Sequence, residues 1–464
     1  MSSATATVIP QVTRSRRNVE LLLLVFAVVI PAAAYANVGL AVAGEIPSGM
    51  WGYTAGLGLL VLVAHLVLRR FAKYADPLLL PLVTLVNGLG LVVIHRVDLA
   101  LIATGKSKSA VAPTQLLWTA IGIAFFTAVV VAVKDHRTLQ RYTYTAGAAG
   151  LALLALPAFL PNSEINGAKL WVRIGGFSIQ PGEFAKILLM IFFAGYLVVK
   201  RDALALAGKR ILGVDLPRGR DLGPILVAWG LGLLILVFEK DLGTSLLFYG
   251  SFVALLYIST ERISWLLLGG LLFLSGAYFA YLIFGHVQVR VESWLDPFAD
   301  PGGSTFQILH SLMGLAWGGV TGTGLGQGHV EYQGIYGRSD FIIAAYGEEL
   351  GLAGLMALLL IYALVVERGF RTAVGCRDPF GKLLAAGFAV ILSLQVFVVV
   401  GGVTKLIPLT GLTTPFMAAG GSSLVANWAI IGLLLRISDH ARRPAPETTP
   451  PTSPDDEKTQ VVRL

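Results

Sequence analysis

The sequence predicts an all-α polytopic membrane protein with about twelve transmembrane helices. The 464 residues have a mean hydropathy of +0.75, and only 13% of them are charged, whereas about a quarter are charged in soluble proteins. Apolar windows of about 20 residues, the length that crosses a hydrocarbon core of roughly 30 Å, occur twelve times. These windows predict helices because backbone in lipid must satisfy its own hydrogen bonds, and no alternating barrel pattern appears.

The windows divide the chain into four parts. A cytoplasmic N-terminus (1–18) precedes two extra N-terminal helices (19–76), a ten-helix body (77–440) and a disordered tail (441–464) that is rich in Pro, Thr and acidic residues. The windows lie at residues 19–42, 51–70, 77–95, 115–134, 143–160, 183–200, 222–238, 242–258, 263–285, 341–366, 381–402 and 412–436.

The distribution of basic residues predicts the orientation of these helices. Most of the 35 Lys and Arg residues fall in the segments that are cytoplasmic if the N-terminus is inside. Both termini are therefore predicted to be cytoplasmic, the protein to be a multi-pass protein of the plasma membrane, and the loop 286–340 to be extracellular. The same bias explains the net charge of +8 without a nucleic-acid partner.

Metal and disulfide signatures are missing from the sequence itself. Cys376 is the only cysteine, which excludes an intrachain disulfide and a multi-cysteine metal site. The seven histidines show no ligand spacing. No cofactor is evident, although a divalent cation (Mg²⁺ or Mn²⁺) remains compatible with the sequence.

The long loop 286–340 contains the densest group of turn residues. Its stretch Trp294–Gln307 reads WLDPFADPGGSTFQ, with an Asp-Pro pair at Asp296 and another at Asp300. An Asp before Pro ordinarily makes an Asx-turn or a helix cap. The next stretch, 306–319, has apolar residues at helical spacing and predicts an amphipathic or re-entrant helix, which a glycine-rich segment follows.

Two further groups of charges lie within predicted membrane helices. Glu183 and Lys186 are three residues apart on one helix face, where a structural ion pair and a functional site are equally good interpretations. Glu348 and Glu349 lie two turns inside the tenth window, so at least one is expected to face the bundle cavity. Asp340 and Asp241 precede helices and are candidate caps.

Six motifs of this sequence, in order, resemble the SEDS proteins, the FtsW/RodA/SpoVE family of bacterial cell-wall polymerases, and the layout is closest to an actinobacterial RodA type. They are NGAKLWVRIGGFSIQPGEFAK, EKDLGTSLL, LDPFADPGGSTFQILHSL, GTGLGQG, RSDFIIAAYGEELGLAG and IPLTGLTTPFMAAGGSS. The resemblance covers residues 77–436. It implies a peptidoglycan glycosyltransferase that polymerises lipid II into glycan strands at the outer face of the plasma membrane, releases undecaprenyl pyrophosphate, and works with a class B penicillin-binding protein.

The resemblance also implies functional residues. The Asp of the second Asp-Pro pair, Asp300, is the implied catalytic base, and Asp296 is left with turn chemistry. An α-linked donor and a β-linked product imply one inversion, which needs a single base. The leaving pyrophosphate favours nearby cations. Candidate substrate-binding residues are the polar side chains in or beside the motifs: Arg173, Lys186, Glu183, Gln307, Asp340, Glu348 and Lys405.

Some motif positions depart from the family pattern, and other functions compete with polymerisation. Gly182, Ser339 and Ala419 replace the usual Ser, His and Tyr, so those side chains carry no chemistry here.

The competing functions are a lipid II flippase, a non-catalytic scaffold of the wall synthesis complex and a small-solute transporter. The last leaves the long exterior loop without a purpose.

Overall fold

The structure, a computed structural model, consists mainly of a bundle of long helices. It describes residues 15–160, 164–165, 168–175, 177–205, 209–211, 214–216, 227, 230–231, 234 and 240–444. Its helices are α1 (Arg17–Ala43), α2 (Met50–Phe71), α3 (Leu79–Ala103), α4 (Ala112–Ala132), α5 (Arg137–Gln140), α6 (Thr143–Phe159), α7 (Pro181–Ala205), α9 (Leu242–Thr260), α10 (Ser264–Ile283), α11 (Gly285–Leu295), α12 (Phe306–Gly318), the 3₁₀ helix η1 (Val330–Arg338), α13 (Ile342–Gly375), α14 (Pro379–Val403) and α15 (Gly421–Arg442).

The described helices confirm a polytopic membrane protein. Ten of them are long and apolar enough to cross a membrane, and α6 is a shorter apolar helix. Eleven of the twelve predicted windows thus coincide with described helices. The window 222–238 lies largely outside the described residues, as do residues 1–14 and the predicted tail from residue 445 onward.

The last predicted window was wrong at its start. Residues 412–420 are not helical, and α15 begins at Gly421. Side chains of three other helices satisfy the backbone carbonyls of this buried segment. Asn87 of α3 donates to Phe416, Gln115 of α4 to Ala418, and Tyr362 of α13 to Pro415. Non-helical backbone inside a membrane protein is tolerated when protein groups replace water in this way.

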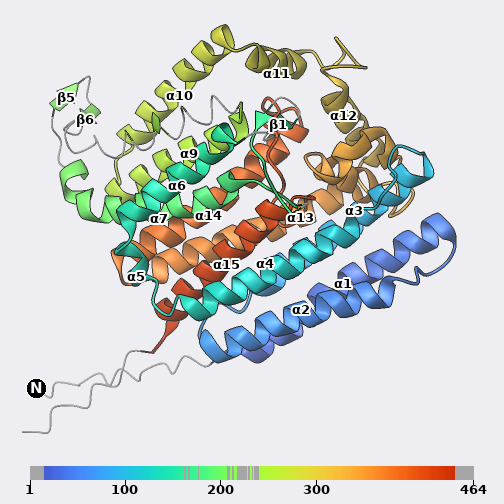
Figure 1. Ribbon diagram of the computed structural model, residues 1–464, viewed down its shortest axis with the longest axis horizontal. Coiled ribbons are helices and arrows are strands. Elements are labelled where there is room, and N and C mark those ends of the chain that lie inside the picture. Colours follow the sequence, from blue (N-terminus) through green and yellow to red (C-terminus); the bar gives the residue numbers. More distant parts are fainter. Residues whose placement is uncertain are drawn as a thin grey trace, which may run out of the picture.

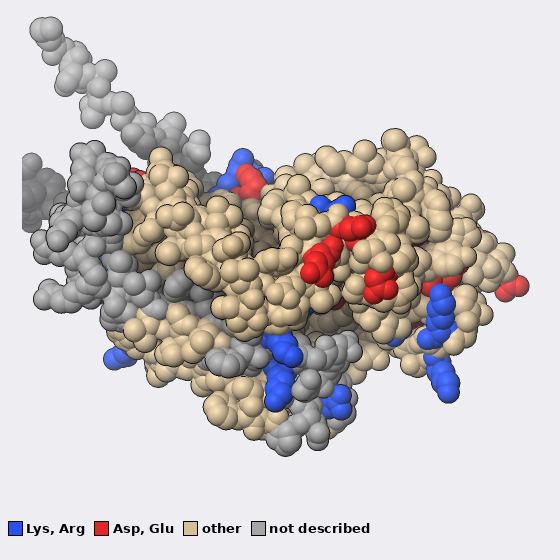
Figure 2. Space-filling model, turned by 90° about the horizontal axis from the view of Figure 1, so that it is seen from above, with Lys and Arg blue, Asp and Glu red and all other residues tan. Residues whose placement is uncertain are grey.

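Burial separates the centre of the bundle from its edge. In α15, 94% of the most apolar stretch is buried, against 6% in α10. In Figure 1, α15 lies within the bundle, and α1 and α2 run side by side along its flank, where they contact α3 and α4. Figure 2 shows few charged side chains on the described surface, as expected for a surface that contacts lipid.

Short hairpins are the only β structure among the described residues. Strand β1 (Glu164–Ile165) pairs with β2 (Ala168–Lys169), β3 (Val172–Ile174) with β4 (Phe177–Ile179), and β5 (Lys209–Ile211) with β6 (Val214–Leu216), all antiparallel. The first two hairpins lie in the segment that connects α6 with α7. They leave the predicted all-α class unchanged, because each strand has only two or three residues.

The long loop between α10 and α13 is largely helical. The helix predicted for residues 306–319 is α12, whereas α11 was not predicted. We call the end of the bundle that carries α11, α12 and η1 the loop end. Figure 1 shows α12 at upper right and α5 at the opposite end, at lower left.

Candidate functional site

Asp300 lies in an exposed turn, residues 296–305, that leads from α11 to α12. Its Oδ2 accepts hydrogen bonds from the backbone N–H of Ser304 at 2.8 Å and from the Ser304 hydroxyl at 3.2 Å. Asp296 makes a similar local bond, because its Oδ1 accepts from Phe298 N at 3.0 Å. Both carboxylates are exposed. The turn chemistry predicted for Asp-Pro pairs therefore occurs at both positions, and solvent reaches the Asp300 carboxylate.

Lys405 ties the start of this turn to the α14–α15 segment. Its Nζ is 3.4 Å from the carbonyl oxygen of Leu295, and its own carbonyl accepts from Trp294 Nε1 at 3.0 Å. Gln307 is the second residue of α12 and is half-buried. Lys405 and Gln307 thus flank the Asp300 turn in space, as a shared substrate surface would require.

Glu183 and Lys186 form an ion pair, which is one of the two interpretations that their spacing left open. Lys186 Nζ lies 2.6 Å from Glu183 Oε2, and both side chains are buried in the first turns of α7. The same ammonium donates to Asn427 Oδ1 at 3.1 Å and to Gln395 Oε1 at 3.3 Å. Three helices therefore converge on one buried cation.

A second group of charges adjoins this pair at the loop end. Asp241 caps α9 as predicted, since its Oδ1 accepts from Thr244 N at 2.9 Å. Burial raises the pKa of Asp241 against the hydrogen bonds from Thr244, the neighbouring Glu183 carboxylate raises it further, and Arg290 of α11 lowers it. Burial lowers the pKa of Arg290, and the negative charges of Asp241 and Asp340 raise it in opposition. Arg290 also donates to the Leu409 carbonyl at 2.9 Å.

Asp340 does not cap α13, so that prediction was wrong. The N-cap residue is Phe341, and no side chain caps the helix. Asp340 stands one position earlier, half-buried and within the electrostatic reach of Arg290. Burial raises the pKa of Asp340 to about 6, against the opposing effects of Arg290 and the Ser339 hydroxyl. Asp340 therefore belongs to the charged group formed by Glu183, Lys186, Asp241 and Arg290, which we call the loop-end cluster.

Glu348 and Glu349 bind the exterior loop. Glu348 accepts from His329 N and from Gln333 Nε2, the latter at 3.1 Å. Glu349 accepts from Arg96 Nε at 2.7 Å and from Gly326 N at 3.0 Å. Both side chains are buried, and their described partners are the loop and Arg96 of α3. A substrate contact for Glu348 remains a prediction.

The reason for this arrangement is a break in α13 at Gly351. Its φ of 65° and ψ of −169° interrupt the helix, and the interruption frees backbone groups on either side. The carbonyls of Glu348 and Glu349 accept from the N–H groups of Thr323 and Gly324, both at 3.0 Å. Conversely, Leu352 N and Ala353 N donate to Gly319 and Val320. The glycine-rich segment thus replaces the missing helical hydrogen bonds.

Two further arginines differ in their surroundings, the predicted Arg173 and Arg338. Arg173 is exposed on β3, opposite Ser178 of β4. Arg338 is tied to Asp98 of α3 by an ion pair of 2.8 Å. Sequence reasoning missed Arg96, Asp98, Gln395 and Asn427. The signal was available, because polar side chains within an apolar helix are costly unless they have partners.

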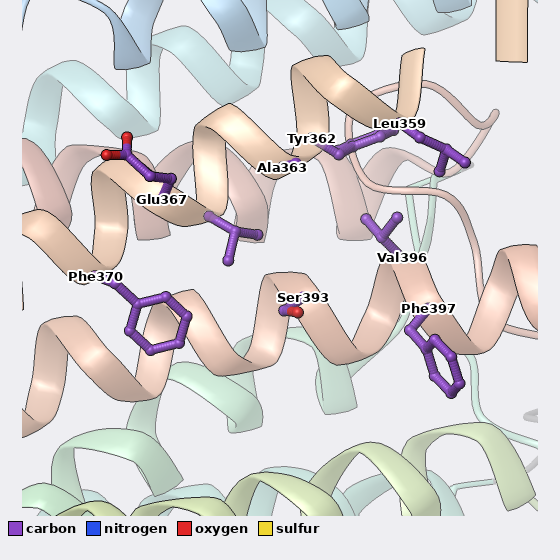
Figure 3. A pocket seen from close by; sticks show the side chains of 9 residues that line it. Leu359, Tyr362, Ala363, Glu367, Phe370, Ser393, Val396 and Phe397 are labelled. Atoms are coloured by element: carbon purple, nitrogen blue, oxygen red, sulfur yellow. The ribbon is translucent and has the colours of Figure 1, made fainter. Parts of the chain in front are cut away.

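A groove of about 480 Å³ lies between α13 and α14, away from the loop-end cluster. Figure 3 shows its lining, which includes Phe370, Val396, Phe397, Ser393 and Glu367. The lining is mostly apolar and offers a single carboxylate, so the groove suits hydrocarbon rather than bond-making chemistry.

Comparisons with known proteins agree with the motifs. A family model described as Cell cycle protein, FtsW/RodA/SpoVE, matches residues 77–443. The peptidoglycan glycosyltransferase RodA of Mycobacterium bovis is 55% identical over 434 residues, which cover 93% of this chain and 92% of that protein.

Solved structures show the same fold. A chain from work on the structural coordination of polymerization and crosslinking by a peptidoglycan synthase complex has a TM-score of 0.56 at 26% identity, covering 85% of this chain and 98% of that one. The crystal structure of the rod shape determining protein RodA of Thermus thermophilus has a TM-score of 0.53 at 24% identity, covering 80% and 98%. The chain therefore belongs to the FtsW/RodA/SpoVE family.

Proposed function

We propose that this protein is a peptidoglycan glycosyltransferase that polymerises lipid II into glycan strands at the outer face of the plasma membrane, releasing undecaprenyl pyrophosphate, in cell elongation or division. The observation that carries this proposal is the 55% identity, over 93% of the chain, to a protein named for that activity. Both termini are proposed to be cytoplasmic, which places the loop end, with Asp300 and the loop-end cluster, outside the cell.

Asp300 is proposed to act as the single general base of an inverting displacement. The acceptor hydroxyl attacks the anomeric carbon, its proton passes to Asp300, and the carbon–oxygen bond to the pyrophosphate breaks. Both hydrogen bonds described for this carboxylate use Oδ2. Oδ1 is therefore the oxygen proposed to receive the proton, and its exposure allows a lipid-linked sugar to reach it.

The leaving pyrophosphate would be stabilised by cations of this chain. Arg173 is exposed, and Arg290 stands half-buried at the loop end, whereas Lys186 is already occupied by Glu183, Asn427 and Gln395. Arginine suits phosphate because its guanidinium donates two parallel hydrogen bonds. Among the described residues of the loop end, His, Cys, Asp and Glu side chains form no group of three that could hold a metal ion. No step is therefore assigned to Mg²⁺ or Mn²⁺.

A class B penicillin-binding protein is the proposed partner. The similar solved chain comes from a synthase complex that couples polymerization with crosslinking. In this protein α10 is the least buried of the ten described helices that could cross a membrane, and Gly270 and Gly276 have open space at their Cβ positions. Small residues on an exposed helix let a second helix approach closely, so α10 is a candidate docking face.

A flippase is the second candidate function, because broken helices such as α13 are common in transporters. Here, however, the glycine-rich segment occupies the break and satisfies its backbone groups. The break therefore builds a fixed loop support, which favours the polymerase over the flippase.

The decisive experiment compares Asp300→Ala with Asp296→Ala. Asp296 belongs to the other Asp-Pro pair of the same turn and is also exposed. Each full-length variant is paired with its partner transpeptidase and supplied with lipid II. We expect Asp300→Ala to lower glycan formation by about 10²–10⁴-fold, the usual contribution of general base catalysis, with expression and partner binding retained. Asp296→Ala should stay within a few-fold of wild type.

Two outcomes would contradict the proposal. Normal polymerisation by Asp300→Ala would exclude Asp300 as the base. A wild-type protein that makes no glycan but moves labelled lipid II between leaflets would be a flippase, and one that does neither while still binding its partner would be a scaffold.

A further inference from the structure

A group of metal-ligand side chains lies at the α5 end, far from the loop-end cluster. Two loops that are distant in sequence contribute to it. His136 comes from the connection between α4 and α5, and Cys376 and Asp378 come from the connection between α13 and α14. Their donor atoms lie within 4.8 Å of one another. Ligand spacing along the sequence could not reveal this set, because about 240 residues separate its two halves.

The three donors already converge on one point. Asp378 Oδ1 is 2.9 Å from His136 Nε2 and 3.2 Å from Cys376 Sγ. Ligand atoms of a tetrahedral Zn²⁺ site stand about 3.3–3.8 Å apart, given metal bonds of about 2.0–2.3 Å. An opening of a few tenths of an ångström would therefore convert this hydrogen-bonded group into three ligands.

Gly381 packs against all three donors and places no side chain between them. A Cβ at this position would lie 2.4 Å from His136 Nε2, 2.7 Å from Cys376 Sγ and 2.9 Å from Asp378 Oδ2. Only glycine fits at position 381, so this residue fills none of the region that the three donors face. The N–H of Gly381 meanwhile donates to Asp378 Oδ2 at 2.6 Å, which fixes the carboxylate and leaves Oδ1 turned toward the other two donors.

The unpaired nitrogen of His136 gives an independent indication of a ligand. The His136 side chain is 1% exposed, and among the described residues its Nδ1 has no hydrogen-bond partner. Asp135 Oδ1 lies 3.8 Å from this nitrogen and is partly exposed. In zinc sites the second ring nitrogen of a ligating histidine usually donates to a carboxylate. A small movement of Asp135 would complete that arrangement.

We propose that His136 Nε2, Cys376 Sγ and Asp378 Oδ1 bind one Zn²⁺ ion at the α5 end, with water as the fourth ligand and Asp135 as acceptor for His136 Nδ1–H. Nitrogen, sulfur and carboxylate ligands together suit Zn²⁺ better than Mg²⁺ or Ca²⁺. On binding, the Cys376 thiol loses its proton to solvent, and the neutral imidazole carries its proton on Nδ1. The Arg137 guanidinium, 3.5 Å from Asp378 Oδ1, turns toward solvent. The ion would link the α4–α5 connection to the start of α14.

Cobalt substitution in the purified full-length protein tests the site, because Co²⁺ reports a bound thiolate by its charge-transfer absorption. We expect one equivalent of Co²⁺ to bind with a thiolate band, Zn²⁺ to displace it, and Zn²⁺ to raise the melting temperature of wild type. Cys376→Ser should abolish the band. His136→Gln should weaken binding at least about tenfold, the lower limit for losing even an outer-shell partner.

Two controls keep folding apart from binding. Asp378→Asn retains the helix cap, because Asn caps as well as Asp, and should weaken metal binding without changing the metal-free melting temperature. His329→Gln changes an exposed histidine at the loop end, so this variant should bind Co²⁺ as wild type does. Less than half an equivalent bound to wild type, a cobalt spectrum without a thiolate band, or unchanged binding by His136→Gln would overturn the proposal.

Discussion

The two halves of the long loop between α10 and α13 differ in how they are held. The Asp300 turn is exposed, and its carboxylates bond only to residues two to four positions away. The glycine-rich half, residues 319–340, is connected to α3 and α13 by hydrogen bonds of Arg96, Glu348 and Glu349. Local bonds leave a segment free to move as a unit, whereas buried long-range bonds fix it. The carboxylate of the proposed base is thus held by local bonds, although Lys405 anchors the start of its turn, whereas buried contacts fix the glycine-rich half.

The largest expected effect comes from the ion pair that holds the fixed half. Glu349→Gln leaves Arg96 buried without its counter-charge, and such a loss typically costs about 3–5 kcal/mol of stability. Thermal or denaturant unfolding of the purified protein measures it. Glu331→Gln is the matched control, because Glu331 pairs only with the exposed His329 at 3.4 Å and should cost less than about 1 kcal/mol. Equal losses of stability in the two variants would show that the buried ion pair holds the glycine-rich half no more firmly than the surface pair does.

The break in α13 should be the next most sensitive position. In Gly351→Ala the new Cβ would lie 2.3 Å from Gly322 N, at a φ of 65°. That backbone region is essentially restricted to glycine, so the strain costs about 1–3 kcal/mol. Gly375→Ala, near the end of the same helix with open space around it, should be neutral or slightly stabilising. Melting temperatures of the two variants compare them directly. Similar values would show that the break at Gly351 does not help to fix this half of the loop.

Asp340, where the fixed half ends, should make stability depend on pH. Its folded pKa of about 6 exceeds the ordinary value near 3.9, so the folded protein favours the protonated acid. This contribution to stability is complete below pH 4 and is lost as pH rises through 6. We expect wild type to lose on the order of 1–2 kcal/mol between pH 4.5 and 7 relative to Asp340→Asn, which cannot titrate. A constant difference between the two unfolding curves across that range would contradict the assignment.

The sequence predicted the fold class and the position of most helices because apolar windows directly report the lipid environment. It also placed Glu183 and Lys186 on one helix face, since they are three residues apart, and offered the ion pair as one of two interpretations. It could not show that Glu349 meets Arg96, or that Asp340 stands outside the helix beside Arg290. Those contacts depend on the break at Gly351 and on packing between distant helices. A glycine within an apolar window carries no signal that distinguishes a broken helix from a continuous one.

The smallest expected effect contrasts a serine of the exposed Asp300 turn with a buried serine of α12. Ser304→Ala removes only a hydroxyl that donates to Asp300 in the exposed turn, because the backbone N–H at 2.8 Å remains. Stability should change by no more than about 0.5 kcal/mol, and glycan formation should stay within a few-fold of wild type. Ser311→Ala in α12 deletes a fully buried donor to the Val403 carbonyl, 3.1 Å away, and should cost about 1 kcal/mol. If Ser304→Ala instead destabilised the protein as much as Ser311→Ala, the Asp300 turn would itself be part of the fixed support, and the proposed base would act from a rigid position.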